Sequence, residues 1–337
     1  MDFLSDKAVA RLREAEGSPD FSTTRYTLRE FLARGGMGVV YLAQDQVLDR
    51  RVAIKILDSA DPDGALAERL NKEARVLAQL EHPGIVPVHD AGTLPGGHVF
   101  YVMKFVEGKR LDQFLAGVPS LPERLRLFLR ICDSVSFAHS RGILHRDLKP
   151  SNVMIGAFGE VLVMDWGLAK ILEQDATPNS RPAVSSVALS SSSTTTPAAR
   201  SSAATQDGIA MGTPGFMSPE QAAGKSADLD ERSDIFSLGK LLEFVARPAA
   251  SQNSVWPPRA LGAICDKAAA ANRTERYGKV AELADDVSRF LDGSPVSAHR
   301  ENLWELSLRF YHRYQPAILL ITMYLLMRTL FAIYSRR

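Results

Sequence analysis

The sequence HRDLKPSN occupies residues 145–152 and is the stretch that decides the fold. One short loop combines a carboxylate, an ammonium and an amide, carried by Asp147, Lys149 and Asn152. The carboxylate can accept the proton of an attacking hydroxyl, and the ammonium can reach the charge that builds on a transferred phosphoryl group. The amide of Asn152 supplies a neutral oxygen for Mg²⁺. This loop therefore predicts phosphoryl transfer to a hydroxyl.

The same string resembles the catalytic loop of the eukaryotic-like, bacterial-type Ser/Thr protein kinases. The resemblance implies an α+β, bilobal protein-kinase fold over residues 26–292, with a β-rich N-lobe (26–105) and an α-rich C-lobe (106–292). It implies ATP and Mg²⁺ as cofactors and Asp147, Lys149, Asn152 and Thr213 as catalytic residues. The expected partners are protein substrates with Ser or Thr acceptors.

Composition sets broad bounds. A chain of 337 residues suggests about two domains, and a net charge of +1 does not indicate a nucleic-acid surface. Cys132 and Cys265 have no CxxC partner and lie in apolar helical patterns, which predicts buried free thiols in a reducing cytosol. Residues 1–20 are charged and lack an apolar signal core, so we expect a short N-terminal extension.

Hydrophobic periodicity predicts strands at the start of the chain and helices after them. The predicted strands cover residues 26–31, 39–42, 52–57 and 98–106. One helix follows the third strand, with its apolar face made by Leu66, Leu70, Leu77 and Leu80. Further helices are predicted over residues 121–138, 235–245, 260–271 and 280–291. This order matches the two lobes that the resemblance implies.

A glycine cluster lies between the first two predicted strands. Glycines there let backbone amides approach phosphate oxygens closely, although a plain glycine hairpin has the same composition. A dinucleotide-binding loop is excluded because a strand-like run, and not a helix, follows the glycines. The cluster resembles the kinase glycine-rich loop with its first glycine replaced by alanine. The residues then expected at the nucleotide are Leu32, Ala33, Arg34, Gly35, Gly36, Met37, Gly38, Val39 and Val40.

Lys55 ends an apolar strand, 17 residues after Gly38, where an ordinary lysine would extend its side chain to solvent. The resemblance instead implies that Lys55 contacts the α- and β-phosphates and that Ala53 lines the nucleotide site. Glu73 would pair with Lys55, and formation of this ion pair can report the active state. Without the resemblance, Glu73 reads as an exposed helical carboxylate.

Residues 101–108, YVMKFVEG, resemble the strand and hinge that bind adenine through backbone groups. Met103 would be the gatekeeper, and Lys104 and Val106 would offer the hinge carbonyl and amide. An edge strand also fits this pattern. Lys104 stands where the family usually has an acidic residue, which backbone recognition tolerates.

Two later motifs complete the resemblance. Residues 164–167, MDWG, resemble the D-F-G motif with Trp166 in place of phenylalanine, which implies that Asp165 joins Asn152 in holding Mg²⁺. Residues 212–220 resemble the end of the activation segment. There Thr213 would hydrogen-bond near the catalytic residues, which is associated with Ser/Thr specificity.

Two long-range contacts are also implied. Glu220 would pair with Arg276, and Asp234 would accept hydrogen bonds from the backbone of the catalytic loop.

An insertion lies between the MDWG motif and residues 212–220. Its residues 177–205 contain 14 Ser or Thr among 29 residues, and we expect them to be disordered in isolation. Phosphates there can pair with Arg146, or the insertion has no regulatory role; the sequence leaves both open.

The tail carries the remaining expectation. Residues 293–315 are predicted to be a juxtamembrane linker, and residues 316–334 are apolar except for Thr322, Arg328 and Thr329. Such a run is close to a bilayer core in length, so a single C-terminal transmembrane helix is predicted, with the kinase domain in the cytoplasm. Arg328 counts against a span. The alternative is an apolar helix packed on the kinase or on a partner.

Three functions are compared. The first is an active Ser/Thr protein kinase that autophosphorylates, with self-association as the route. The second is a membrane-tethered pseudokinase acting as a binding module, motivated by Ala33, Lys104 and Trp166. The third, a small-molecule phosphotransferase, is disfavoured because such enzymes typically lack the Lys149-Pro150 pair and the segment 213–220.

Overall fold

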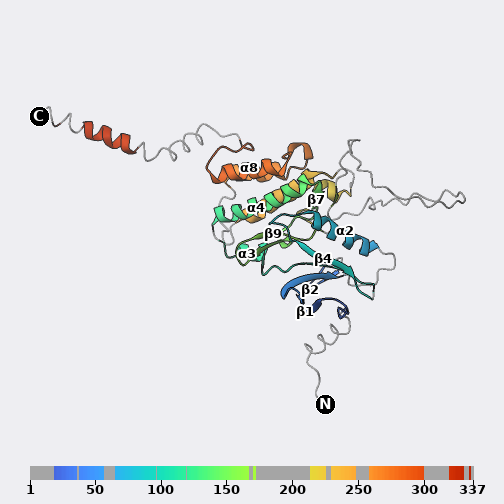
Figure 1. Ribbon diagram of the computed structural model, residues 1–337. Helices are drawn as coiled ribbons and strands as arrows, with labels where there is room; N and C mark the ends of the chain where they lie inside the picture. Colours follow the sequence, from blue (N-terminus) through green and yellow to red (C-terminus); the bar gives the residue numbers. More distant parts are fainter. Residues whose placement is uncertain are drawn as a thin grey trace, which may run out of the picture.

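The first part of the chain is mainly strands with one helix, and the second part is mainly helices with a few short strands (Figure 1). This computed structural model describes residues 19–35, 38–56, 65–95, 97–118, 120–166, 170–171, 213–224, 229–247, 258–299, 319–329 and 334. In Figure 1, β1, β2 and β4 lie at one end of the fold and α4 and α8 at the other. The two-lobed architecture expected from the sequence is confirmed.

The N-lobe is one antiparallel five-stranded sheet in the order β1-β2-β3-β5-β4. Its elements are β1 (Tyr26–Gly35), β2 (Gly38–Asp45), β3 (Arg50–Ile56), α2 (Ala65–Gln79), β4 (Val88–Thr93) and β5 (Val99–Lys104). In the central pair, the β3–β5 register places Lys55 opposite Tyr101. Helix α2 packs on β5 and β4. It thereby covers the face of the sheet to which both of these side chains point.

The C-lobe is built around α4, which contacts α6, α8 and the short strands. A three-stranded sheet, β6-β8-β9, and the pair β10-β7 hold the loops next to the N-lobe. In chain order the elements are β6 (Gly108–Arg110), α3 (Leu111–Leu115), α4 (Leu121–Ser140), β7 (Ile143–Leu144), η1 (Pro150–Asn152), β8 (Val153–Gly156), β9 (Val161–Val163), β10 (Lys170–Ile171), α5 (Pro219–Ala222), α6 (Glu231–Ala246), α7 (Arg259–Ala268), η3 (Arg273–Glu275) and α8 (Val280–Leu291).

The two lobes share one hydrophobic core. Buried apolar side chains run continuously from Ala53 and Met103 in the N-lobe to Leu241 in α6. The backbone joins the lobes as well, because Val163 N donates to Gly84 O at 2.8 Å beside a parallel bridge between Ile85 and Val163. This continuity holds the active-site loops against the sheet.

Most of the predicted elements are confirmed, with differences at their ends. Helix α8 has the predicted bounds, whereas β1 continues to Gly35 and β4 was not predicted at all. Strand β4 contains Asp90 and Gly92, two residue types that are uncommon in strands and that interrupt the alternation of apolar and polar residues. This segment therefore forms a strand because it pairs with β5, and not because of its own sequence pattern. Cys132 and Cys265 are buried and free, as predicted.

Several sequence expectations fall outside the described residues. They concern Gly36 and Met37 of the glycine cluster, most of the extension 1–20, the whole of the insertion 177–205, and most of the linker 293–315. Of the predicted span, residues 319–329 and 334 are described and are helical. Within the part of the chain that the structure describes, no helix has both the length and the apolar character needed to cross a membrane. The transmembrane helix therefore stays a prediction.

Gly239 gives a test of the packing between α6 and α7. A Cβ added there would lie 2.8 Å from the Ala268 Cβ and 2.9 Å from the Ala269 backbone N. These atoms can move away only if the backbone of α7 shifts. We expect Gly239→Ala to lower the thermal midpoint, because an overpacking cost of about 1–3 kcal/mol exceeds the gain of about 1 kcal/mol in helix propensity. Gly117→Ala, whose Cβ would meet only Phe114 O at 3.7 Å, is the control and should be neutral.

Candidate active site

A buried carboxylate fixes the backbone of the catalytic loop. Asp234 in α6 accepts hydrogen bonds at 2.8 Å from His145 N, from Arg146 N and from the His139 ring. Burial raises the pKa of Asp234, but the bonds from His139 and the loop outweigh it and leave the pKa below its usual value. Arg146 has a φ of 70°, an unusual conformation for a side-chain-bearing residue, and the anchored backbone holds it there. The expected role of Asp234 as an acceptor for this loop is confirmed.

The four predicted catalytic residues meet in one hydrogen-bonded group. Lys149 Nζ lies 2.6 Å from Asp147 Oδ2 and donates to Thr213 Oγ1 at 2.6 Å. Thr213 Oγ1 in turn donates to Asp147 Oδ1 at 3.0 Å. The Asn152 amide nitrogen donates to Asp147 O at 2.9 Å and to Oδ2 at 3.0 Å. Lys149, Thr213 and Asn152 each contact the carboxylate of Asp147, which is 9% exposed, and together they orient it.

Lys55 and Glu73 form the buried ion pair expected from the sequence. Lys55 Nζ lies 2.9 Å from Glu73 Oε1 and 2.8 Å from Oε2. The same ammonium lies 3.5 Å from Asp165 Oδ1, which brings the N-lobe lysine to the MDWG motif. Burial alone lowers the pKa of Lys55, but the charges of Glu73 and Asp165 outweigh it and raise the pKa above its usual value. Lys55 therefore stays charged where it lies, between Glu73 of α2 and Asp165 of the MDWG motif.

Asp165 and Asn152 offer oxygens of the kind that Mg²⁺ prefers. The Asp165 side chain is 47% exposed, and Asn152 uses its amide nitrogen for Asp147, which leaves its carbonyl oxygen for another partner. Among the described residues, no group of three or more His, Cys, Asp or Glu side chains forms a metal site. Asp165 and the Asn152 carbonyl oxygen are therefore two protein ligands that would need phosphate oxygens to complete a Mg²⁺ site. Magnesium is commonly bound in this way next to nucleotides.

Trp166, which stands where the D-F-G motif has phenylalanine, is buried beside His145. Its side chain is 1% exposed and its ring centroid lies 4.6 Å from that of His145. The indole N–H donates to Val163 O at 3.4 Å. Asp165 itself has a φ of 60°, so the packed Trp166 holds a strained turn that aims the carboxylate toward Lys55.

The expected nucleotide-contacting residues that the structure describes lie on β1, β2, β3 and β5 and just after β5. In the glycine cluster, Leu32 is 38% exposed, Val39 is buried, and Gly38 has a φ of 158° next to the loop. Ala53, Met103 and Val106 are buried, and Lys104 is exposed, with its backbone amide donating to Pro87 O at 3.1 Å. Nucleotide contacts by these residues, and by Ala33, Arg34, Gly35 and Val40, remain predictions.

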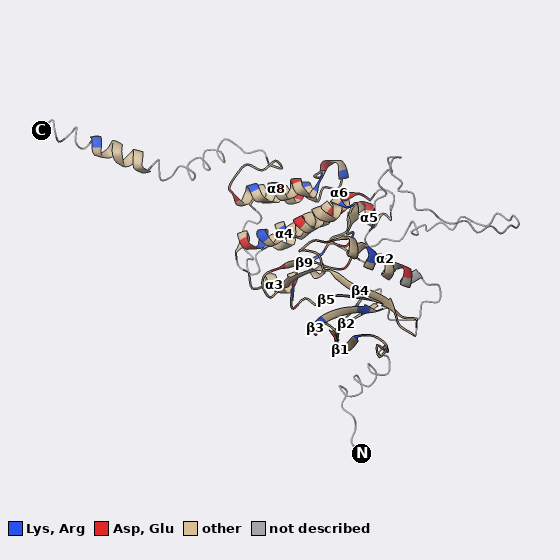
Figure 2. Ribbon diagram, viewed as in Figure 1, with Lys and Arg blue, Asp and Glu red and all other residues tan. Residues whose placement is uncertain are grey.

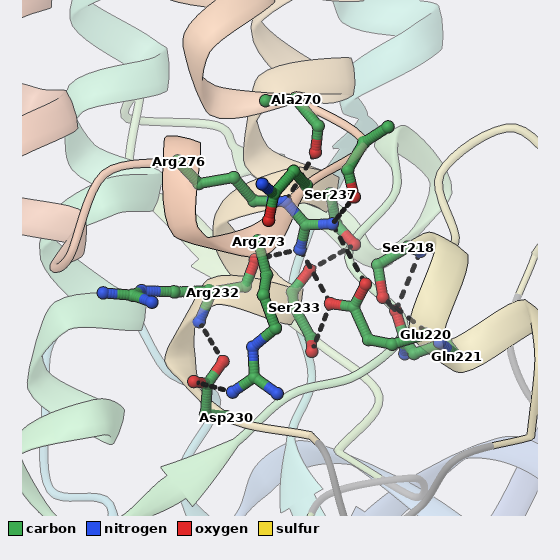
Figure 3. Close-up of polar contacts among 12 residues, drawn as sticks. Ser218, Glu220, Gln221, Asp230, Arg232, Ser233, Ser237, Ala270, Arg273 and Arg276 are labelled. Atoms are coloured by element: carbon green, nitrogen blue, oxygen red, sulfur yellow. Dashed lines mark hydrogen bonds and ion pairs between the residues drawn. The ribbon is translucent and has the colours of Figure 1, made fainter.

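The end of the activation segment is anchored to the C-lobe (Figure 3). Arg276 holds both carboxylate oxygens of Glu220, with Nη1 at 2.7 Å and Nη2 at 3.0 Å, as the resemblance implied. Ser233 Oγ donates to the same carboxylate at 2.8 Å. Burial raises the pKa of Glu220, but the Arg276 pair and the other hydrogen bonds outweigh it and bring the pKa down to about 2.

A second anchor was not predicted from the sequence. Ser218 and Gln221 form a reciprocal capping box at the start of α5, and the Gln221 amide donates to Arg146 O at 2.7 Å. This bond ties the segment that carries Thr213 to the catalytic loop. The S-P-E-Q string gave a signal for the cap, because Ser followed by Gln three residues later is typical of a helix start. The contact with Arg146 depends on tertiary structure alone.

The fold and this geometry define a protein kinase. The family model described as "Protein kinase domain" matches residues 26–255, and the chain belongs to this family. Serine/threonine-protein kinase PknD of Chlamydia trachomatis serovar D is 32% identical over 335 residues, covering 88% of this chain and 34% of PknD. PknD of Chlamydia caviae is 35% identical over 308 residues, covering 80% of this chain and 32% of PknD.

Solved structures give the same result. The crystal structure of the Mycobacterium tuberculosis PknI kinase domain matches with a TM-score of 0.53 and 26% identity, covering 79% of this chain and 96% of that domain. The recognition of a bacterial-type Ser/Thr protein kinase is thus confirmed. The chain spans about a third of the length of the PknD relatives, whose coverage is 32–34%.

The Glu220–Arg276 pair gives a pH prediction. A carboxylate with a lowered pKa stabilises the fold above its usual pKa of 4.5, and this stabilisation is lost as the pH falls toward about 2. At neutral pH, Glu220→Gln should lower the free energy of unfolding by about 3 kcal/mol, because Arg276 loses its buried counter-charge. In urea unfolding, the difference from the wild type should shrink from about pH 4.5 downward.

Glu243→Gln is the matched control. Glu243 pairs with Arg247 one helical turn away, but its side chain is 36% exposed, so its removal should change stability by less than about 0.5 kcal/mol at any pH. A difference between Glu220→Gln and the wild type that does not vary with pH would contradict the assignment of the low pKa to Glu220.

Proposed function

We propose that this protein is an active Ser/Thr protein kinase, which transfers the γ-phosphoryl group of Mg-ATP to Ser or Thr hydroxyls of proteins. One observation carries the proposal: Asp147, whose carboxylate is oriented by Lys149, Thr213 and Asn152, lies in the same structure as an intact Lys55–Glu73 pair that reaches Asp165. The relatives named as serine/threonine-protein kinases support the residue specificity.

In this proposal the N-lobe holds the nucleotide. The strand ends around residues 32–40 close over the phosphates, the backbone of residues 104–106 accepts the adenine, and the ammonium of Lys55 pairs with phosphate oxygens. Asp165 and the carbonyl oxygen of Asn152 would hold Mg²⁺, which when bound supplies neutralising charge to the phosphates. Lys55 is suited to its part because its raised pKa keeps it charged.

Asp147 then acts on the acceptor hydroxyl. Its carboxylate accepts the hydroxyl proton as the oxygen attacks the γ-phosphorus and the bond to the β-phosphate oxygen breaks. Lys149 lies 2.6 Å from Asp147 Oδ2, so it can stabilise negative charge on the transferring group from beside the base. Thr213 positions both residues, which links the activation segment to the chemistry.

The pseudokinase hypothesis is not favoured. Of the three substitutions that motivated it, Trp166 packs against His145 as an apolar residue should, and Lys104 lies on an exposed strand end where its backbone remains in the β5 register. Ala33 lies within β1, paired with Val40, so its methyl group does not break the sheet. None of the three removes a group that the proposed chemistry uses.

Replacing the proposed base tests the enzyme. Asp147→Asn should reduce autophosphorylation, measured with radiolabelled ATP, by about a thousandfold, because the amide cannot accept the proton. Asp133→Asn alters a carboxylate on α4 that is 76% exposed and away from the site, and should retain full activity. Equal incorporation by the wild type and Asp147→Asn would refute catalysis. Phosphate placed on Asp147→Asn by added wild type would support self-association.

We further propose that the kinase domain ends near residue 292, in the cytoplasm, and that residues 316–334 anchor it in the cell membrane. In the described helix over residues 319–329, eight apolar side chains are each at least 51% exposed: Leu319, Leu320, Ile321, Met323, Tyr324, Leu325, Leu326 and Met327. Figure 2 draws most of this helix in tan, the colour of residues other than Lys, Arg, Asp and Glu. Exposed apolar surface of this kind is typical of membrane or protein contact.

Removal of the tail tests the anchor. The full chain should sediment with membranes and resist carbonate extraction, whereas a chain ending at residue 314 should be released, because the apolar side chains that favour the bilayer are gone. Both proteins should phosphorylate themselves alike. A full chain that stays in the supernatant would eliminate the membrane anchor without affecting the proposed kinase activity.

A further inference from the structure

Glu73 has a second donor besides Lys55. The hydroxyl of Tyr101 in β5 donates to Glu73 Oε1 at 2.9 Å. Because the β3–β5 register pairs Lys55 with Tyr101, the two side chains lie on the face of the sheet that α2 covers. All three side chains are buried: Lys55 is 8% exposed, and Glu73 and Tyr101 are each 2% exposed. In the sequence, Tyr101 is simply part of the strand that precedes the expected hinge.

The chemistry of the two groups fixes the direction of this hydrogen bond, because an ionised carboxylate only accepts and the phenol has a proton to donate. Burial and the nearby carboxylate of Glu73 raise the pKa of Tyr101 well above its usual value, so the phenol keeps its proton and donates. Glu73 Oε1 therefore receives two donors, Tyr101 Oη and Lys55 Nζ. The Lys55 ammonium also lies 5.8 Å from the centroid of the Tyr101 ring, so the phenol limits its movement from a second side.

Lys55 and Tyr101 share the hydrogen bonding of the Glu73 carboxylate. An ammonium on a flexible four-carbon stem has three donors, and a buried carboxylate with no other partner would draw them toward itself. With Oε1 already bonded to Tyr101, Lys55 can hold Glu73 and still direct charge toward Asp165, 3.5 Å away, where the phosphates are proposed to lie.

We propose that Tyr101 is a positioning residue for nucleotide binding: its hydroxyl fixes Glu73, and through Glu73 it places the Lys55 ammonium for the phosphates. The inference deepens the proposed function and rests on it. Tyr101 acts through another residue and does not touch the nucleotide. Its removal should therefore weaken recognition of the phosphates and leave recognition of the adenosine part intact.

The experiment compares two ligands on the full chain, with and without the hydroxyl. Tyr101→Phe keeps the ring and removes only the donor. By calorimetry, we expect the Kd of Mg-ATP to rise about tenfold, in the range of a lost hydrogen bond to a charged group, while the Kd of adenosine changes less than about twofold. Adenosine has no phosphate for Lys55, so it reports any general damage to the site.

Tyr277→Phe is the matched control, because it removes another buried phenol-to-carboxylate bond, from Tyr277 to Asp286 at 2.8 Å in the C-lobe. It should lower the thermal midpoint and leave both Kd values unchanged. In a double-mutant cycle, Tyr101→Phe should add less than about twofold to the ATP effect of Glu73→Gln, since both act through one carboxylate.

Three results would overturn the inference: equal losses for Mg-ATP and adenosine, no loss for either, or full multiplication of the two effects in the double variant. A wild-type chain that binds no Mg-ATP would instead reject the proposed function itself. The two failures are thus distinguishable in the same titrations.

Discussion

Glu73 is a carboxylate at 2% exposure between a helix and a sheet, and its charge is tolerated there because Lys55 and Tyr101 both donate to it. The position of α2 depends on this compensation. Because Lys55 also reaches Asp165, the same buried charge links the helix, the sheet and the MDWG motif. A displacement of any one of these elements would leave an uncompensated charge in the interior.

The C-lobe solves an equivalent problem with Asp234. That carboxylate is completely buried and is bonded to two backbone amides of the catalytic loop, which lets Arg146 adopt a positive φ. The loop is then locked from its other side by Gln221. Both lobes therefore use a buried carboxylate to hold functional groups in conformations that their local sequence does not favour, which is the expected way to preorganise a site.

The activation segment connects these two systems. Thr213 bonds to Asp147 and Lys149, and Glu220, a few residues later, is held by Arg276. The end of the activation segment is therefore held at two points: by the Thr213 hydroxyl at the catalytic loop and by the Glu220–Arg276 ion pair in the C-lobe.

Hydrophobic periodicity in the sequence determined the lobe order, and the quoted motifs determined the resemblance to the kinase family, which in turn implied the pairs Lys55–Glu73 and Glu220–Arg276. Tertiary structure alone decided strand β4, whose own pattern is weak, and the contacts of Tyr101 and Gln221. Tyrosine in an apolar strand reads as core, and only the β3–β5 register turns its hydroxyl toward Glu73. Strand register and helix packing depend on residues that are distant in the sequence, so a local sequence pattern does not predict them.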